Sequence, residues 1–312
     1  MVDYLAEDAL LFDRRAVRQH RERAIGNRDN PLFAEAAARL ADRLLDMRRR
    51  FALALDFGTR GGECAAAVAA SGRVERLVLC DGSARALMRG PGAGPAAAAV
   101  VAEEELPPFA AGCLDLVTSS LALHWTNDLP GVLAQLRRSL KPDGLLLAAL
   151  FAGETLRELR EVLIEAELAE SGGASPRVSP FVDTAEASAL LQRAGFALPV
   201  VDIDTLTLTY RDAFALMRDL RAMGEANALR ARSRGFSRRG VFLSAADRYA
   251  RRYGQADGRV RATFQIAFLT GWVPAPGQQK ALPRGGAAAR LADALESDEL
   301  PAGEKAGAPG RR

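Results

Sequence analysis

The stretch that decides the fold is "FALALDFGTRGGE", which runs from Phe51 to Glu63. Residues 51–57 are apolar except for Asp56, as is typical of a strand buried in a parallel sheet. Gly58 and Gly62 follow, and an alanine-rich helical segment comes next. A buried strand that breaks into a glycine-rich turn before a helix predicts a βα unit with a ligand at the carboxyl end of the strand.

Arg60 stands in the middle of this turn, where many cofactor-binding loops carry another glycine. Glycines there let a ligand approach the backbone, because they have no Cβ atom. We expect the turn to tolerate Arg60 if its φ angle stays negative and its side chain points outward. The alternative is that the turn only joins a strand to a helix and binds nothing.

Strands and helices alternate through the first half of the chain. Continuous apolar strands between helices predict a parallel sheet that helices cover on both faces. "KPDG" (Lys141–Gly144) predicts a turn before the fifth strand, with Gly144 allowing a positive φ. The strand candidates are 51–57, 76–80, 98–101, 114–119 and 145–151, and the helical stretches are 63–70, 83–89 and 129–140.

The pattern changes after Phe151. We expect a helix with Thr184 as N-cap and Gly195 as C-cap, and an alternating strand at 200–210. Further helices are expected at 154–169, 211–229 and 244–253, and a last strand ends before Pro274. The predicted fold class is α/β: a Rossmann-like, seven-stranded, mostly parallel sheet with N-terminal helices and a helical insertion before the last strand.

These elements predict the domain organisation. Residues 1–50 form an N-terminal helical cap, in which one helix buries Leu32, Phe33, Ala36, Leu40 and Leu44 on one face. Residues 51–274 form the main domain, with the insertion at about 211–260. From residue 275 onward Gly, Pro, Ala and Gln dominate, so we expect 275–312 to be a tail that is partly disordered.

Acidic residues also follow the second and third predicted strands. Asp81 ends the second strand, where a carboxylate can accept hydrogen bonds from both hydroxyls of a ribose or can cap the next helix. Glu103 and Glu104 come just after the third strand and can accept from an adenine amino group, or can lie in a solvated loop. Three neighbouring strand ends with this chemistry predict an adenosine site.

The charge of the site indicates which adenosine ligand it holds. The turn lacks the close G-x-G pair that grips a pyrophosphate, and the carboxylate of Asp56 disfavours two phosphates. S-adenosylmethionine carries a positive sulfonium and an amino acid. An acidic pocket lined by glycine therefore suits this cofactor better than a dinucleotide.

These motifs resemble those of class I S-adenosylmethionine-dependent methyltransferases. Asp56, Gly58 and Gly62 match the first motif, Asp81 matches the ribose acid, and Glu103 matches the acid beside adenine. The resemblance implies methyl transfer with S-adenosyl-L-methionine as cofactor. The complete predicted cofactor site is Asp56, Gly58, Thr59, Gly62, Asp81, Gly82, Glu103, Glu104 and Ser120.

Longer segments are similar to the complex I assembly-factor group of this fold, whose mitochondrial member hydroxylates an arginine of a complex I subunit. They are "LALHWTNDLPGVLAQLRRSLKPDGLLLAALFAGETLRELR", "GGASPRVSPF", "MRDLRAMGEANAL" and "ATFQIAFLTGW". The resemblance implies action on a protein in respiratory complex I assembly. "LALHWTNDL" is also similar to the malonyl-carrier-protein O-methyltransferase of biotin synthesis. The alternatives are therefore that enzyme or a non-catalytic assembly scaffold, with a complex I subunit or an acyl carrier protein as partner.

His124 and Trp125 follow the fourth strand, where a substrate meets the cofactor. His124 can act as a general base and Trp125 can wall a substrate pocket, or both can simply pack. No metal site is predicted, because His20 and His124 are the only histidines and lie in different segments. The residues themselves therefore do not explain a hydroxylation.

Charge and composition restrict the partners. The net charge is +3, which is too small to indicate a nucleic-acid-binding protein. Arg218–Arg239 is rich in arginine and either docks an acidic partner or is a solvated face. Three scattered cysteines and the lack of a signal peptide or a long apolar run predict a cytoplasmic protein, at most peripheral at the inner membrane.

Overall fold

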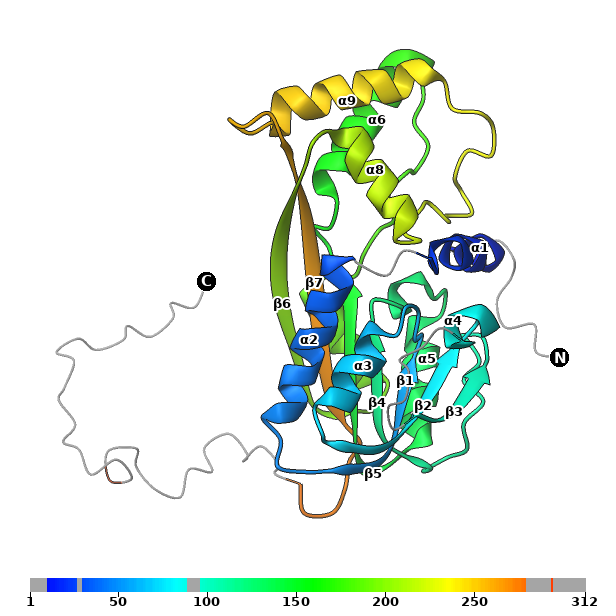
Figure 1. Cartoon of the computed structure of the whole chain (residues 1–312), viewed down its shortest axis with the longest axis vertical. Helices are drawn as coiled ribbons and strands as arrows, with labels where there is room; N and C mark the ends of the chain where they lie inside the picture. The colour runs from blue at the N-terminus through cyan, green and yellow to red at the C-terminus, as the bar shows by residue number, and fades with distance from the viewer. Residues whose placement is uncertain (1–9, 27–29, 89–95, 279–292, 294–312) are drawn as a thin grey trace, which may run out of the picture. The chain divides into compact units, whose positions relative to one another are not determined.

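The computed structural model describes residues 10–26, 30–88, 96–278 and 293. In this part of the chain, seven strands form one sheet in the order β3-β2-β1-β4-β5-β7-β6 (Figure 1). The β7 strand is antiparallel to both of its neighbours, and the other pairs are parallel, which confirms the predicted fold class. The strands are β1 Phe51–Phe57, β2 Val74–Asp81, β3 Ala96–Val101, β4 Leu114–Ser120, β5 Leu140–Phe151, β6 Ala197–Tyr210 and β7 Val260–Trp272.

Helices cover both faces of the sheet. One buried cluster joins the sheet to α2, α3, α6, α8 and α9, and a second cluster joins the opposite face to α5 and α7. The helices are α1 Arg14–Ala24, α2 Pro31–Leu45, α3 Glu63–Ala70, α4 Ala84–Met88, α5 Leu129–Ser139, α6 Arg157–Ser171, α7 Thr184–Arg193, α8 Ala213–Ala222 and α9 Arg239–Tyr253. A short 3-10 turn, Leu123–Trp125, follows β4.

The N-terminal segment contains two helices. The predicted apolar face of α2 is buried, and its five residues join the core, where α2 contacts α3, β4 and β5. Asn30 caps α2 by accepting a hydrogen bond from the backbone N–H of Leu32, and Pro31 occupies its first turn. Helix α1 lies at the end of the sheet near α4 and α8 (Figure 1).

The long strands β6 and β7 determine where the insertion between them lies. They pair from Ala197↔Trp272 to Tyr210↔Val260. This ladder carries α8 and α9 to the end of the molecule where α6 lies (Figure 1). Both helices lie between β6 and β7 in sequence, as expected for the 211–260 insertion, but α8 ends at Ala222 rather than extending to 229 because the next residues turn back into the site.

Two local predictions were wrong. The "KPDG" segment lies inside β5, where the pairing with β4 shifts register between Leu114 and Leu116, and Asp143 rather than Gly144 has the positive φ (61°). The extra residues form an irregularity in a continuous strand, which removes the need for a separate turn. The N-cap of α7 is Asp183, and Thr184 is its first helical residue.

The C-terminal prediction lies mostly outside the described residues. Contacts divide the chain into residues 1–275 and 276–312, and of the second unit only 276–278 and 293 are described.

The capping of α7 gives a stability test. Asp183 accepts a hydrogen bond from the backbone N–H of Glu186 (2.8 Å), and the Glu186 carboxylate accepts one from the backbone N–H of Asp183. We expect Asp183→Ala to lower the free energy of unfolding by about 1 kcal/mol, because it removes this capping box. The matched control Thr184→Ala should change it by less than about 0.5 kcal/mol in urea denaturation. A larger loss for Thr184→Ala than for Asp183→Ala would contradict the assignment.

Candidate functional site

The turn after β1 has a backbone shape that requires glycine. Gly58 and Gly62 have φ angles of 73° and 91°. The N–H groups of Gly58 and Thr59 both donate to the carbonyl of Cys80 in β2, at 2.8 and 3.1 Å. A Cβ atom at Gly58 would overlap that of Ala122, just beyond β4. The ends of β1, β2 and β4 are therefore drawn together at the switch point of the sheet, where ligands bind in open α/β folds.

Arg60 does not point outward, so that prediction was wrong. Its φ is +53°, the left-handed conformation that the usual glycine adopts easily. Its guanidinium is buried and donates to the carbonyls of Leu121 (2.5 Å) and Met223 (2.7 Å) and to Glu225 Oε1 (2.6 Å). It also lies over the ring of Phe33, 4.4 Å from its centroid. These contacts explain why an arginine tolerates a strained backbone here.

Asp81 is the last residue of β2 and faces the same turn. Its Oδ2 accepts a hydrogen bond from the backbone N–H of Arg60 (2.9 Å), and its Oδ1 accepts from the N–H of Ser83 (2.8 Å). Burial raises the pKa of Asp81, and the nearby charge of Arg21 partly offsets this. Each carboxylate oxygen has a second lone pair, so Asp81 can still accept hydrogen bonds from a ligand.

The predicted adenine-side acids bind helix α1. Glu104 is buried and pairs with both Arg14 and Arg21, while the half-exposed Glu103 pairs with Arg18. Burial opposes ionisation of Glu104, but the two arginines outweigh it and hold its pKa at about 2. Arg21 also donates to the carbonyl of Ala122 (2.8 Å). Helix α1 is thereby fixed over the ends of β3 and β4.

Asp56 is fully buried near the end of β1. Its Oδ1 accepts a hydrogen bond from the Thr118 hydroxyl (3.1 Å), whereas its Oδ2 has no hydrogen-bond partner among the described residues. Burial raises the pKa of Asp56 to about 6, although the Cys64 thiol and two hydroxyls lower it in part. An orphaned carboxylate oxygen at this depth suits a cationic ligand group.

The space around these residues is narrow. A cavity of about 30 Å³ is lined by Arg60, Gly61, Asp81 and Arg21 among others, and another of about 10 Å³ by Gly82, Glu103, Glu104 and α1. Ser120 lines a third cavity, of about 10 Å³, together with Thr59. Every predicted cofactor residue thus lies at the carboxyl end of β1–β4. Arg21 borders the first two cavities.

The end of β4 holds a second buried cluster, which includes both catalytic candidates. Glu225 Oε2 lies 3.0 Å from Nε2 of His124 and accepts a hydrogen bond from Nε1 of Trp125 (2.7 Å). Burial would raise the pKa of Glu225, but the charge of Arg60 and the interaction with His124 hold it below its usual range. Burial lowers the pKa of His124, so the neutral ring donates from Nε2, and its Nδ1 has no partner among the described residues.

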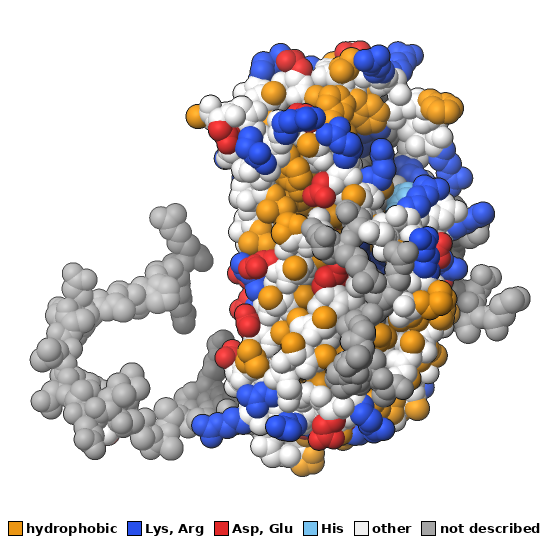
Figure 2. Space-filling model, viewed as in Figure 1, with side chains coloured by type: hydrophobic (Ala, Val, Ile, Leu, Met, Phe, Trp, Pro, Cys, Tyr) orange, Lys and Arg blue, Asp and Glu red, His pale blue; other side chains and the backbone are white. Residues whose placement is uncertain are grey.

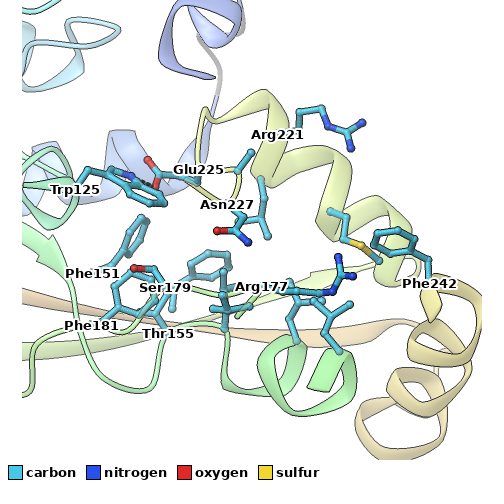
Figure 3. Close-up of a pocket in the computed structure, with 18 residues that line it drawn as sticks. Trp125, Phe151, Thr155, Arg177, Ser179, Phe181, Arg221, Glu225, Asn227 and Phe242 are labelled. Carbon is cyan, nitrogen blue, oxygen red and sulfur yellow. Dashed lines mark hydrogen bonds between the residues drawn. The ribbon is translucent and has the colours of Figure 1, made fainter. Parts of the chain in front are cut away.

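A larger cavity of about 220 Å³ begins at this cluster and extends under the insertion (Figure 3). Trp125 and Glu225 lie at one end, while Arg177 and Phe242 lie toward the other. Most of the lining is apolar and comes from β5, β7, α6, α8, α9 and the 177–181 loop; it includes Phe151, Leu159, Phe181, Met217, Leu220 and Phe264. Such a cavity suits a substrate side chain that enters between the insertion and the sheet.

Sequence reasoning missed two parts of the site. Glu225 was overlooked, although it is the only acid between Asp219 and Asp247 in an arginine-rich segment. The α1 arginines were given no role, although Arg14, Arg18 and Arg21 recur at the spacing of one helical face. That regular spacing opposite three consecutive glutamates was the available clue.

The described residues contain neither a candidate metal cluster nor a candidate membrane span. No group of three His, Cys, Asp or Glu side chains there is placed to hold a metal ion. No helix in that part of the chain combines the length and the apolar character that a membrane crossing requires.

The fold and the site define a class I S-adenosylmethionine-dependent methyltransferase. The family model described as "Methyltransferase domain" matches residues 55–148. The BH2331 protein of Bacillus halodurans C-125, a candidate methyltransferase by its own description, superposes with a TM-score of 0.55 at 16% identity. The match covers 77% of this chain and 100% of that one, which confirms the fold.

Within this class, the chain belongs to the family of the NDUFAF5 proteins. It is 40% identical over 294 residues to "Arginine-hydroxylase NDUFAF5, mitochondrial" of Danio rerio, covering 93% of this chain and 91% of that protein. It is also 33% identical over 281 residues to a malonyl-[acyl-carrier protein] O-methyltransferase of Methylovorus sp. (strain MP688), covering 86% and 92%. Both predicted resemblances are confirmed, and the chain is a methyltransferase-like enzyme.

Gly58 offers a test of the close approach between β1 and β4. We expect Gly58→Ala to lower the free energy of unfolding by about 2–4 kcal/mol, because it adds both left-handed strain and an overlap with Ala122. Gly72→Ala is the matched control: its φ is +65° but nothing lies within 4 Å of the added Cβ, so it should cost only about 1–2 kcal/mol. Equal losses in urea denaturation would show that the overlap is relieved.

Asp56 offers a pH test. Its folded pKa of about 6 lies above the unfolded value, so folding favours the protonated form. The contribution of Asp56 to the free energy of unfolding therefore falls as the pH rises from about 4 to about 6, and the cost persists above that range. Asp56→Asn lacks this titration, so its stability relative to wild type should rise by about 2–3 kcal/mol across the window, measured by denaturant unfolding. A difference that does not change with pH would contradict this assignment.

Proposed function

We propose that this chain binds S-adenosyl-L-methionine at the ends of β1–β3 and modifies a protein side chain held in the 220 Å³ cavity. The observation that carries the proposal is the position of Glu225. This residue lines the cavity and also binds Arg60 of the glycine-rich turn, so the two sites share a wall. Their contiguity is what group transfer between a cofactor and a substrate requires.

The donor set fits the cofactor. Asp81 would hold the ribose hydroxyls, the orphaned Oδ2 of Asp56 suits a cationic amino group, and the turn at Gly58 offers a close backbone approach. The available space is smaller than the roughly 300–1,000 Å³ of typical ligand pockets. Because Arg21 borders both cavities beside Asp81, entry of a nucleoside requires Arg21 and α1 to shift.

The residues of this chain would supply positioning and a dry site. When bound, the cofactor supplies an electrophilic methyl group. Trp125 and Phe151 exclude water from the end of the cavity, and Glu225 fixes the Nε2–H tautomer of His124. The Nδ1 of His124 has no partner among the described residues, so this nitrogen is the candidate to accept a proton as a general base.

The relatives and the surface charge support a protein substrate. By analogy with the NDUFAF5 relatives, we place the chain in respiratory complex I assembly, at most peripheral to a membrane. Residues 226–246 hold five arginines and no acid. Basic and apolar side chains lie together at the end of the molecule that carries α9 (Figure 2), which suits an acidic partner surface.

A second candidate is carboxyl methylation of a malonyl unit on an acyl carrier protein, as in the Methylovorus relative. Two cationic residues, Arg177 and Arg221, line the cavity and suit a carboxylate substrate. Arg177 is already paired with Glu167, so Arg221 would carry this recognition.

Calorimetry with S-adenosylhomocysteine tests the cofactor part. We expect binding to wild type and a loss of about 10-fold or more in Asp81→Asn, because an amide offers one acceptor oxygen in place of two. The matched control Asp115→Asn lies near the start of β4, at the opposite end of the sheet, and should bind within twofold of wild type. No heat with wild type, or equal binding in both variants, would overturn the cofactor site.

Mass spectrometry then distinguishes the reactions. The chain is incubated with S-adenosylmethionine and either complex I subunits or malonyl-acyl carrier protein. A gain of one methylene on a subunit supports protein methylation, and the same gain on the malonyl unit supports the second candidate. A parallel incubation is supplied with O2 and a two-electron reductant, and a gain of one oxygen on an arginine there supports hydroxylation as in the NDUFAF5 relatives. Partner binding without any mass change supports the scaffold alternative and contradicts an enzymatic role.

A further inference from the structure

One buried ion pair joins the cofactor turn to the substrate cavity. Arg60 Nη1 lies 2.6 Å from Glu225 Oε1, and the side chains are only 8% and 5% exposed. Arg60 belongs to the turn after β1, whereas Glu225 follows α8 of the insertion, where its backbone N–H donates to the carbonyl of Leu220 (2.8 Å). Residues 165 positions apart in the chain are thus connected at the core of the site.

The backbone at Arg60 indicates that this contact has a specific role. A residue with a side chain at φ +53° costs about 1 kcal/mol relative to glycine. Its guanidinium offsets the cost with acceptors from two segments besides Glu225, namely Leu121 after β4 and Met223 at the end of α8. Its planar, fixed set of donors satisfies all three acceptors at once, which a lysine ammonium does less well in this geometry.

Glu225 contacts both Arg60 and residues at the end of the cavity. Its Oε1 binds Arg60, and its Oε2 binds His124 and Trp125. A buried carboxylate held on both oxygens has little freedom to reorient, because every shift leaves a buried charge or donor unpaired. A displacement of the turn at Arg60 is therefore transmitted to Trp125, which lines the cavity.

We propose that Arg60 is a positioning residue that couples occupancy of the cofactor turn to the orientation of Trp125 through Glu225. This inference rests on the proposed cofactor site. With Arg60 in place of a glycine, a ligand bound at the turn also determines the orientation of Trp125 in the cavity wall. A purely structural role for the pair would contribute to stability and would not change the response of Trp125 to a ligand.

Trp125 fluorescence separates these roles. The only other tryptophan, Trp272, is the last residue of β7 and pairs with Leu145 of β5. Trp272→Phe therefore isolates the fluorescence signal of Trp125. In this background, S-adenosylhomocysteine binding is measured by calorimetry and the Trp125 emission shift is recorded in parallel. We expect the otherwise unchanged chain to bind and to shift its emission at saturation.

Two variants test the coupling. Glu225→Gln keeps the shape and both side-chain contacts on Oε2 but removes the charge that holds Arg60. The double variant Arg60→Gly/Glu225→Gln leaves no unpaired buried charge and restores the residue that a left-handed turn prefers, which protects folding. Both should bind the ligand within about fivefold of the parent, while the emission shift at saturation falls by at least half. The single variant Arg60→Lys keeps a positive charge beside Glu225 and should keep part of the shift.

The outcomes are distinguishable. If the parent gives no heat with S-adenosylhomocysteine, the proposed cofactor site fails, and the coupling fails with it. If the double variant binds and keeps the full emission shift, the coupling is wrong although the cofactor site stands. Thermal denaturation identifies a variant that is merely unfolded, and the double variant then decides the result.

Discussion

The site depends on compensating buried charge at the carboxyl end of the sheet, above all in the pair Arg60–Glu225. Both side chains lie in a region where an unpaired charge costs several kcal/mol. Because Glu225 also satisfies His124 and Trp125, its ionised state organises the end of the cavity as well as the turn. A single carboxylate therefore contacts both the glycine-rich turn and the wall of the 220 Å³ cavity.

The same principle governs the adenosine side of the site. Glu104 is ionised because Arg14 and Arg21 lie beside it, and Arg21 reaches the carbonyl of Ala122 as well. Helix α1 is therefore held by charge rather than by a large apolar contact, since its buried apolar residues are few. Asp56, by contrast, is neighboured by a thiol and hydroxyls rather than by a cation within the described part of the chain. A cationic ligand would gain most there, whereas α1 must give way for the nucleoside.

Most of the fold could be predicted from the sequence, because apolar runs and glycine turns are local. The positions of Asp81 at the end of β2 and of Glu103 just after β3 were predicted from the same local patterns. What could not be predicted depends on contacts between distant segments. The inward orientation of Arg60 depends on its ion pair with Glu225, which follows α8. The orientation of the α1 arginines depends on ion pairs with the glutamates after β3.

The proposed cofactor residues and the residues of the 220 Å³ cavity lie on different parts of the fold. This separation explains how relatives with different named activities share one sheet. The residues proposed to bind the cofactor all lie at the ends of β1–β4, whereas the cavity is completed by α8, α9 and the loop at 177–181. The long β6–β7 ladder carries this insertion over the sheet without altering the strand order. Replacing residues of the insertion can therefore change the substrate while the cofactor turn is kept. Only a residue such as Arg60, which contacts both parts, requires them to change together.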